Sequence, residues 1–466
     1  MTLSIRRFAP LMFVALSGCM VGPDYEAPQT PLPVKFSEGR NASIGNVSLK
    51  PWWTAFTDQR LNSLVAQGMA QNLDVLQAVE RIQSSEANVT SAGAGSLPSL
   101  TGSASQTFSG SDGSYSGRTN RSTSEGGLSV SWLLDLFGEY RRSKESARAS
   151  LDAAYASADV ARLSLLSDLV TSYIDVRYYQ ERMAIARDNL KSRQETLELT
   201  KFRLDAGAAS RLDVVQAEGL VNSTLADMST LETSFRKSAH HVATLIGLPA
   251  ASLVSDLSRS SGQPVAHDAV RTGIPADLVR NRPDIRKAER ELAAAVADIG
   301  VAKAQLFPSI KLSGSISPSY IKSNSASGGI TSWSFGPTLN LPIFDGGALR
   351  ANVQSKESAA RGAYLAWKQT VLNAIEEVEN AMVALSRDGK AVSASRAEVS
   401  SYREALDLST ASYKDGASSL LDVLDAQRSV STAQANLAQA VRQMAADYVT
   451  LNVAIGGGYA AGRLTQ

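Results

Sequence analysis

Side chains that commonly carry out catalysis are scarce in this chain. It has one cysteine, Cys19, and three histidines, His240, His241 and His267. A single cysteine excludes an intramolecular disulfide and any metal site built from several cysteines. His240 and His241 fall late in a predicted helix, where we expect a surface or packing role. We therefore predict neither a metal site nor a nucleophilic triad.

Two further features weigh against an enzyme. The chain lacks the glycine-rich loop with lysine that binds phosphate, so it cannot itself hydrolyse ATP. The carboxylate pair Glu376-Glu377 lies in a heptad-patterned stretch, which indicates a solvated helix face. We predict that the protein is not an enzyme and has no cofactor, a covalent lipid on Cys19 being the one attachment expected.

The surroundings of Cys19 predict that lipid. Residues 1–18 have a basic start and a short apolar run, which ends in Leu16-Ser17-Gly18-Cys19. Such a run fits a cleaved signal peptide better than a membrane span, and its small residues resemble a bacterial lipobox. Met20 follows the cysteine, which by resemblance to bacterial lipoproteins favours the outer membrane. The alternative is an ordinary signal peptide with an incidental cysteine.

The overall composition narrows the class of protein. Its 46 Lys and Arg residues balance 45 Asp and Glu residues, which gives no electrostatic reason to expect a nucleic-acid partner. Aromatic residues are only 6% of the 466, and the abundance of Ala, Ser and Leu suits long helices. After the first segment no stretch has about 18 consecutive apolar residues, so we expect any membrane crossing to use strands.

Short motifs recur in the same order at an offset of about 207–210 residues. The matching pairs are Asn72-Leu73-Asp74-Val75 with Arg282-Pro283-Asp284-Ile285, Leu97-Pro98-Ser99-Leu100 with Phe307-Pro308-Ser309-Ile310, Gly207 and Asp213-Val214 with Gly416 and Asp422-Val423, and Leu245-Ile246-Gly247 with Ala454-Ile455-Gly456. Four matches at one offset indicate a duplication.

Each half is predicted to contain a helix, two strands, a very long helix and a shorter returning helix. The first repeat covers 58–246, with a helix over 58–94, strands in 97–135, a long helix over 139–204 and a returning helix over 210–246. The second covers 276–454, with strands in 308–343, a long helix over 348–414 and a returning helix over 418–454. Residues 19–57 are expected to form an extended lipidated segment, 247–275 an equatorial linker, and 455–466 a tail.

Periodicity supports these assignments. Leu128, Val130 and Trp132 alternate with serines, as in a strand with one apolar face, and the Ser/Gly-rich stretches 109–126 and 322–329 are predicted hairpin turns. The span 139–204 contains no Pro or Gly, and about 66 helical residues make a rod ~100 Å long. A coiled-coil spacing in the second rod runs through Val371, Ile375, Val378, Met382, Leu385, Gly389, Val392, Arg396 and Val399.

The predicted strands imply an oligomer. A chain with only about four strands cannot close a membrane barrel, because the smallest need about eight. An open edge in lipid leaves backbone groups unpaired, so two, three or four chains must share one barrel. The alternative is a soluble sheet packed on its apolar face.

These motifs together resemble the TolC-like outer-membrane factors, in particular the lipoprotein branch of drug-efflux systems that includes NodT-like proteins. The resemblance spans nearly the whole mature chain. The residues that carry it are Cys19 with Val21-Gly22-Pro23-Asp24-Tyr25, Trp52-Trp53, Leu134-Asp135-Leu136-Phe137-Gly138, Arg282-Pro283-Asp284-Ile285, Leu341-Pro342-Ile343-Phe344-Asp345-Gly346-Gly347, Tyr413-Lys414-Asp415-Gly416 and Leu420-Leu421-Asp422-Val423-Leu424-Asp425-Ala426-Gln427-Arg428.

The resemblance implies a mainly α fold with mixed α and β elements. It implies a homotrimer with a 12-stranded outer-membrane β-barrel and a 12-helix periplasmic α-barrel, collared by the N-terminal segment, the linker and the C-terminus. It further implies an outer-membrane component of a tripartite efflux pump, a passive gated exit duct for small molecules. Its partners would be a periplasmic adaptor, an inner-membrane pump of the resistance-nodulation-division type and outer-membrane lipid.

The same resemblance assigns a periplasmic gate. Leu421 and Asp425 are four residues apart, so they lie on one face of a helix. They match an apolar plug and an acidic ring, while Tyr413 and Arg428 match residues that latch neighbouring helices, with Asp213 a possible partner. The tips at Gly207 and Gly416 are expected to dock the adaptor.

Two other functions remain open at this point. A non-conducting periplasmic coiled-coil scaffold accounts for the helices and the lipid, but it leaves the two amphipathic strand pairs without a purpose. An outer-membrane duct of a protein secretion system differs from an efflux duct only in its cargo. The predicted lipid anchor and the Leu424-Asp425-Ala426-Gln427-Arg428 segment favour efflux by resemblance.

Overall fold

The computed structural model describes residues 20–29, 32–33, 35–37, 51–115, 117–259, 261–267, 270, 273 and 275–458. The predicted signal peptide, residues 1–18, and Cys19, the predicted lipidation site, lie outside the described residues, as does the end of the predicted tail. The chain divides into two compact units: unit 1 is Met1–Gln29, Arg81–Tyr155 and Lys287–Lys368, and unit 2 is Thr30–Glu80, Ala156–Arg286 and Gln369–Gln466.

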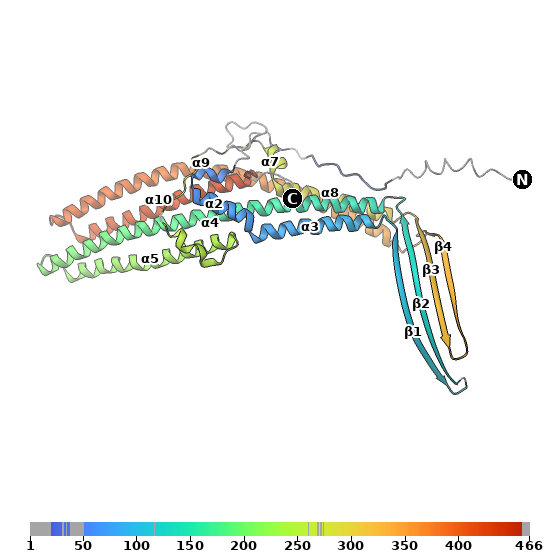
Figure 1. Cartoon of the computed structure of the whole chain (residues 1–466). Coiled ribbons are helices and arrows are strands. Elements are labelled where there is room, and N and C mark those ends of the chain that lie inside the picture. Colours follow the sequence, from blue (N-terminus) through green and yellow to red (C-terminus); the bar gives the residue numbers. More distant parts are fainter. Residues whose placement is uncertain are drawn as a thin grey trace. The chain divides into compact units, whose positions relative to one another are not determined.

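The elements repeat in order (Figure 1). After the 3-10 helix η2 (Trp52–Phe56), the first copy has α2 (Gln59–Gln71), α3 (Leu73–Ala94), β1 (Ser99–Gly113), β2 (Gly117–Leu134), α4 (Glu139–Asp205) and α5 (Arg211–Leu245). After η3 (Ala250–Leu253) and α6 (Val254–Leu257), the second has α7 (Pro275–Asn281), α8 (Pro283–Ala304), β3 (Ser309–Ser323), β4 (Ser327–Asn340), α9 (Ala348–Lys414) and α10 (Leu420–Ala454). The predicted mainly helical fold with two tandem repeats is confirmed.

The single helix predicted over 58–94 is wrong, because the helix breaks at Asn72. The backbone of Asn72 is extended, at ψ 129°, and its side-chain oxygen accepts hydrogen bonds from the first amides of α3, those of Asp74 and Val75. The second copy breaks at Arg282, where the following Pro283 disfavours helical geometry. A break of one residue hardly changes the apolar period, which explains why the pattern concealed it.

The helix breaks at Asn72 and Arg282, both in unit 2, are stabilised by similar hydrogen bonds. The side chain of Asn72 donates a 2.8 Å hydrogen bond to the Leu245 carbonyl at the end of α5. Arg282 donates a 2.8 Å hydrogen bond to the Ala454 carbonyl at the end of α10. The duplication therefore extends from motifs to individual contacts.

The predicted turns were too long. The strands run up to Gly113 and resume at Gly117, and in the second hairpin they run to Ser323 and resume at Ser327. Most of 109–126 and 322–329 is therefore strand. Backbone groups form the hydrogen bonds of the ladder, so serine and glycine residues do not prevent pairing when one face of the sheet is polar.

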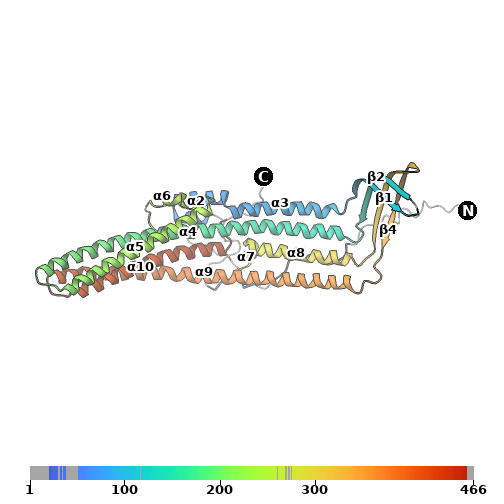
Figure 2. The same cartoon turned by 90° about the horizontal axis from the view of Figure 1, so that it is seen from below.

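All four strands form one antiparallel sheet in unit 1, in the order β1-β2-β3-β4 (Figure 1), and Figure 2 shows the same sheet from below. The two hairpins are joined by β2 and β3, with Leu128 opposite Ile316 and Val130 opposite Gly314. One edge of the sheet is β1 and the other is β4.

The main core of unit 2 joins segments that are distant in sequence. It contains Trp52 and Phe56 from the N-terminal side, Leu253 and Leu257 from the linker, and Tyr448 from α10. The residues just before α2, part of the linker and the last turns of α10 thus pack together.

Candidate functional site

The sheet of unit 1 separates polar from apolar side chains across all four strands. Directly paired residues of antiparallel strands lie on the same face. The face that carries Leu128 also carries its partner Ile316, which in turn pairs with Trp333. Further members of this face are Leu100, Val130, Trp132, Leu312, Phe335 and Leu339.

The other face is lined mainly by small hydroxyl residues. Ser129 pairs with Ser315, and Ser315 pairs with Ser334 at the same level of the sheet. Trp333 and Phe335 stay largely exposed in one chain, so the apolar face has no partner among the described residues. One apolar and one hydroxyl face, in register over four strands, is the pattern of a membrane barrel wall with a wet interior.

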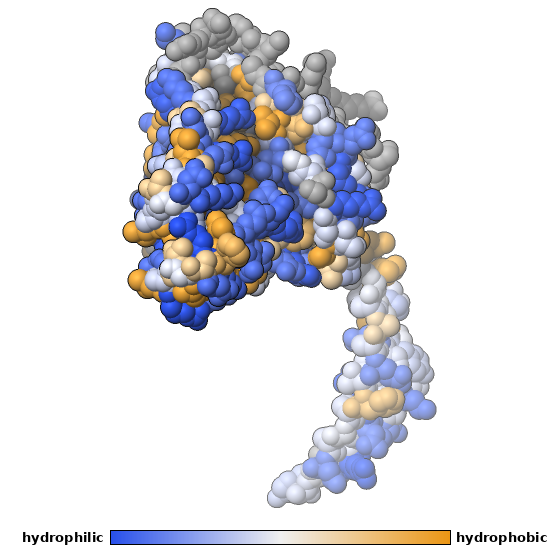
Figure 3. All heavy atoms as spheres, turned by 90° about the vertical axis from the view of Figure 1, so that its left-hand side faces the viewer, coloured by the Kyte–Doolittle hydropathy of each residue, from blue (hydrophilic) through white to orange (hydrophobic). Residues whose placement is uncertain are grey.

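In unit 2 the returning helices begin at two similar turns. Gly207 and Gly416 have positive φ values, 75° and 77°, which favour glycine. Ala208 N–H donates to the Arg203 carbonyl at 2.7 Å and Ala417 N–H to the Ser412 carbonyl at 2.8 Å, a Schellman closure in both copies. The predicted tips are therefore tight helix-ending turns. Figure 3 views this end of the chain, where hydrophilic residues predominate and hydrophobic patches lie among them.

Asp213 is held by its own turn. Its carboxylate accepts hydrogen bonds from the Ser210 amide and hydroxyl, each at 2.8 Å, in a capping box. The second copy repeats this arrangement with Ser419 and Asp422. Asp213 thus completes the capping box at the start of α5, and in the described part of one chain it forms no hydrogen bond with the other predicted gate residues.

Leu421, Asp425 and Arg428 lie along one outer face of α10. Leu421 is 52% exposed, whereas its neighbours Leu420 and Leu424 are buried. Arg428 donates a 2.9 Å hydrogen bond to Asp425 one turn earlier, and both side chains are more than half exposed. A single chain therefore leaves this face free for a neighbour or a lumen.

Tyr413 lies elsewhere, in a small buried cluster with Leu420, Val423 and Leu424. Arg203 of α4 lies over its ring, at 4.4 Å from the ring centre, and donates a hydrogen bond to its carbonyl. The structure thus joins Tyr413 to Arg203 and joins Arg428 to Asp425. It does not join these two pairs within one chain.

The sequence prediction missed Arg203, Arg193 and Gln427. Gln427 is buried against α4, where its amide donates a 2.8 Å hydrogen bond to the Thr196 hydroxyl. Arg193 donates to Thr224, and burial lowers its pKa, as does the positive charge of Arg428, while Asp227 opposes them. Gln427 could have been found from its place in the Leu424–Arg428 segment, but the two arginines had no pattern.

A further missed residue, Leu212, follows from the duplication. Leu212 holds the place in α5 that Leu421 holds in α10, and it is 65% exposed. The repeat offset would have predicted this apolar residue at the first turn.

Comparison with known proteins places this geometry in context. A family model described as outer membrane efflux protein matches residues 64–248 and 274–457, one match in each repeat. The chain is 56% identical to a nodulation protein T of Rhizobium leguminosarum bv. viciae, over 99% of this chain and 95% of that one. It is 32% identical to the toluene efflux pump outer membrane protein TtgI of Pseudomonas putida, over 98% of both chains. The solved outer-membrane channel OprN superposes with a TM-score of 0.84 at 33% identity, over 94% of this chain and 99% of that one.

Proposed function

Because the chain belongs to the outer membrane efflux protein family and is an outer-membrane channel of the efflux type, not an enzyme, we propose that three copies share one exit duct. The observation that carries this proposal is the sheet of unit 1, with its apolar face, its hydroxyl face and its two outer strands β1 and β4. Four strands cannot close by themselves, and pairing β4 of one copy with β1 of the next would remove both edges.

Three chains would bring twelve strands and a polar lumen. The residues of the apolar face would then meet lipid, and serines such as Ser315 and Ser334 would line the duct. Two or four copies would also remove the edges, and family resemblance selects three.

The proposed gate lies at the α10 turn. Threefold symmetry would gather three Leu421 side chains into an apolar plug and three Asp425 carboxylates into an acidic ring. Like charges at such spacing repel by about 1 kcal/mol per pair when solvated, so cations or separation of the chains would relieve the ring. Arg428 already neutralises part of this charge within each chain. Tyr413 and Arg428 would latch neighbouring helices in the closed assembly, with Asp213 as a possible partner.

The partners are proposed from the family. A periplasmic adaptor would dock at the tips around Gly207 and Gly416, and an inner-membrane pump of the resistance-nodulation-division type would supply the energy. Cys19 would carry the lipid. One relative is named for toluene efflux, and for this chain we propose small-molecule cargo selected by the pump.

Native mass spectrometry of the detergent-extracted protein tests the assembly and the lipid together. We expect three chains per particle, each heavier than the mature polypeptide by its acyl groups, and a Cys19→Ser chain that lacks this mass. A monomer in mild detergent would contradict the shared barrel, and an unmodified wild-type chain would contradict only the lipid.

A further inference from the structure

The Val21-Gly22-Pro23-Asp24-Tyr25 motif, to which the proposed duct assigns no role, makes specific contacts in unit 1. The Val21 N–H donates a 3.1 Å hydrogen bond to the Phe137 carbonyl, between the end of β2 and the start of α4. Met20 packs on Gly138, where a Cβ would lie 2.7 Å from the Met20 side chain. The residue that follows Cys19 is thus held at the junction of strand and helix.

Arg142 in the first turn of α4 binds this segment through several hydrogen bonds. Its guanidinium donates to the carbonyls of Val21 and Gly22, at 3.3 and 3.4 Å, and to the Asp24 carboxylate at 2.7 Å. Arg142 is 1% exposed, whereas the Asp24 side chain is 84% exposed. Although burial opposes the charge, Asp24 and Glu145 keep the pKa of Arg142 raised. A buried guanidinium that loses one partner is costly, so Arg142 depends on the segment.

Two glycines allow the segment to reach α8. Gly22 has φ +98°, and a Cβ at this position would lie 2.5 Å from the Cα of Gly300. A Cβ on Gly300 would in turn lie 2.7 Å from the Arg142 side chain. The N-terminal segment, α8 and α4 therefore meet so closely that no side chain fits between the backbones of Gly22 and Gly300.

Tyr25 provides the other end of the attachment. Its hydroxyl donates a 2.7 Å hydrogen bond to Glu289 of α8, and Arg290 lies 5.4 Å from its ring centre. The segment is thus fixed to α4 of the first repeat at one end and to α8 of the second repeat at the other.

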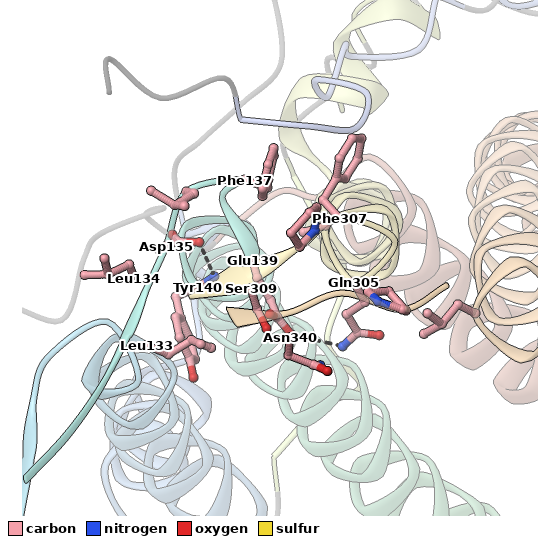
Figure 4. A pocket seen from close by; sticks show the side chains of 15 residues that line it. Leu133, Leu134, Asp135, Phe137, Glu139, Tyr140, Gln305, Phe307, Ser309 and Asn340 are labelled. Carbon is pink, nitrogen blue, oxygen red and sulfur yellow. Dashed lines mark hydrogen bonds between the residues drawn. The ribbon is translucent and has the colours of Figure 1, made fainter. Parts of the chain in front are cut away.

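We propose that Met20–Tyr25 is an N-terminal staple, which ties α4 to α8 beneath the strands and positions the lipid of Cys19 at the strand–helix junction. The second part rests on the lipidation proposed above. Figure 4 shows this junction, where Phe137 stacks on Phe307 with ring centres 4.6 Å apart beside a cavity of 260 Å³. The staple attaches through the carbonyl of the same Phe137.

Cleavage by chymotrypsin after Tyr25 tests the staple in the purified, detergent-solubilised full assembly. Cleavage requires the staple to detach, so Asp24→Asn and Gly22→Ala should be cut about ten-fold faster than wild type. Arg142→Lys keeps a charge for Asp24 but loses the planar fork, and it should fall between wild type and Arg142→Gln. Glu26→Gln is the matched control, because it removes the carboxylate of an exposed residue that lies two positions after Asp24.

Each rate is divided by that of the same variant unfolded in urea, which removes differences in protease preference. Equal normalised rates for wild type, Glu26→Gln, Asp24→Asn and Gly22→Ala would overturn the staple. Intact mass reports the acyl groups separately, so a stapled chain without lipid would contradict only the proposed lipidation. Because Asp24 is exposed and is not part of the paired strands, Asp24→Asn should leave the trimer intact, and loss of the trimer in this variant would also count against the assigned role.

Discussion

Arg203 covers the aromatic ring of Tyr413 and binds its backbone carbonyl, joining the end of α4 to the end of α9. The two residues come from different repeats and from positions that the duplication does not make equivalent. Tyr413 also closes its own helix, since its carbonyl accepts the Gly416 N–H at 3.1 Å. A side chain of α4, in the first repeat, therefore supports the turn between α9 and α10 in the second repeat.

Replacing Arg203 by alanine should loosen this turn. Loss of the cation–π contact and of a charged hydrogen bond should cost about 2 kcal/mol. Hydrogen exchange of the amides of Gly416 and Ala417 should accelerate in the variant. Lys201→Ala removes a cation two residues away that forms an exposed ion pair with Glu198, and this change should have no effect. Equal exchange in both variants would refute the supporting role of Arg203.

Gln427→Ala should weaken the packing of α10 against α4. The buried side-chain amide of Gln427 donates hydrogen bonds to the hydroxyls of Thr196 and Ser192. Truncation to alanine leaves a cavity and removes both hydrogen bonds. We expect a loss of about 2 kcal/mol, measured as a lower denaturant midpoint. Gln216→Ala on the exposed side of α5 is the control and should be neutral. A neutral Gln427 variant would show that this contact contributes little.

Gly247 should tolerate alanine poorly. It has φ +78°, and a Cβ would lie 2.8 Å from the Gln71 carbonyl oxygen, at the joint that Asn72 closes. The positive φ and the clash should together destabilise the protein by about 2 kcal/mol or more. Gly219→Ala in α5, which meets nothing within 4 Å, should instead stabilise by up to about 1 kcal/mol. Thermal unfolding distinguishes the two, and similar midpoints would contradict the joint.

Asp388 should make stability depend on pH. Burial and then the neighbouring Asp447 raise the pKa of Asp388 to about 6 in the folded protein. The folded state binds this proton more tightly than the unfolded state, so the stabilisation is complete below about pH 4 and is lost as pH rises through 6. After allowance for solvent screening, the change is on the order of 1 kcal/mol.

Asp388→Asn should remove that pH dependence and be more stable than wild type at pH 7.5. The control is Asp407→Asn, at an exposed position of the same helix. Denaturation at pH 4, 6 and 7.5 checks the prediction. If the stability of Asp388→Asn depended on pH in the same way as that of wild type, a group other than Asp388 would be responsible.

Features that repeat locally could be predicted from the sequence. The alternation around Leu128, the glycines at 207 and 416 and the duplicated motifs each act on nearby backbone, so their patterns survive in the chain. The break at Asn72 was not predictable, because it depends on a carbonyl contributed by Leu245, far along the chain. The Arg203–Tyr413 contact is equally non-local.

The gate was predictable only in part. Leu421 and Asp425 do lie on one exposed face of α10, as their spacing indicated. Whether they form rings depends on a relationship between copies, and the contacts within one chain do not contain it. Asp213 has a local partner, Ser210, and Tyr413 has a distant one, Arg203, and the family pattern predicted neither.

Conductance in planar bilayers tests the gated duct most directly. Purified wild type, Asp425→Ala and Arg428→Ala would be compared, with Asp407→Ala as the control for lost surface charge. The account predicts a small, cation-preferring conductance for wild type and the control, and a several-fold larger conductance for at least one of the two gate variants. Free conductance in wild type with no effect of either change would contradict the gate at α10, and a folded trimer that never conducts would contradict the duct itself.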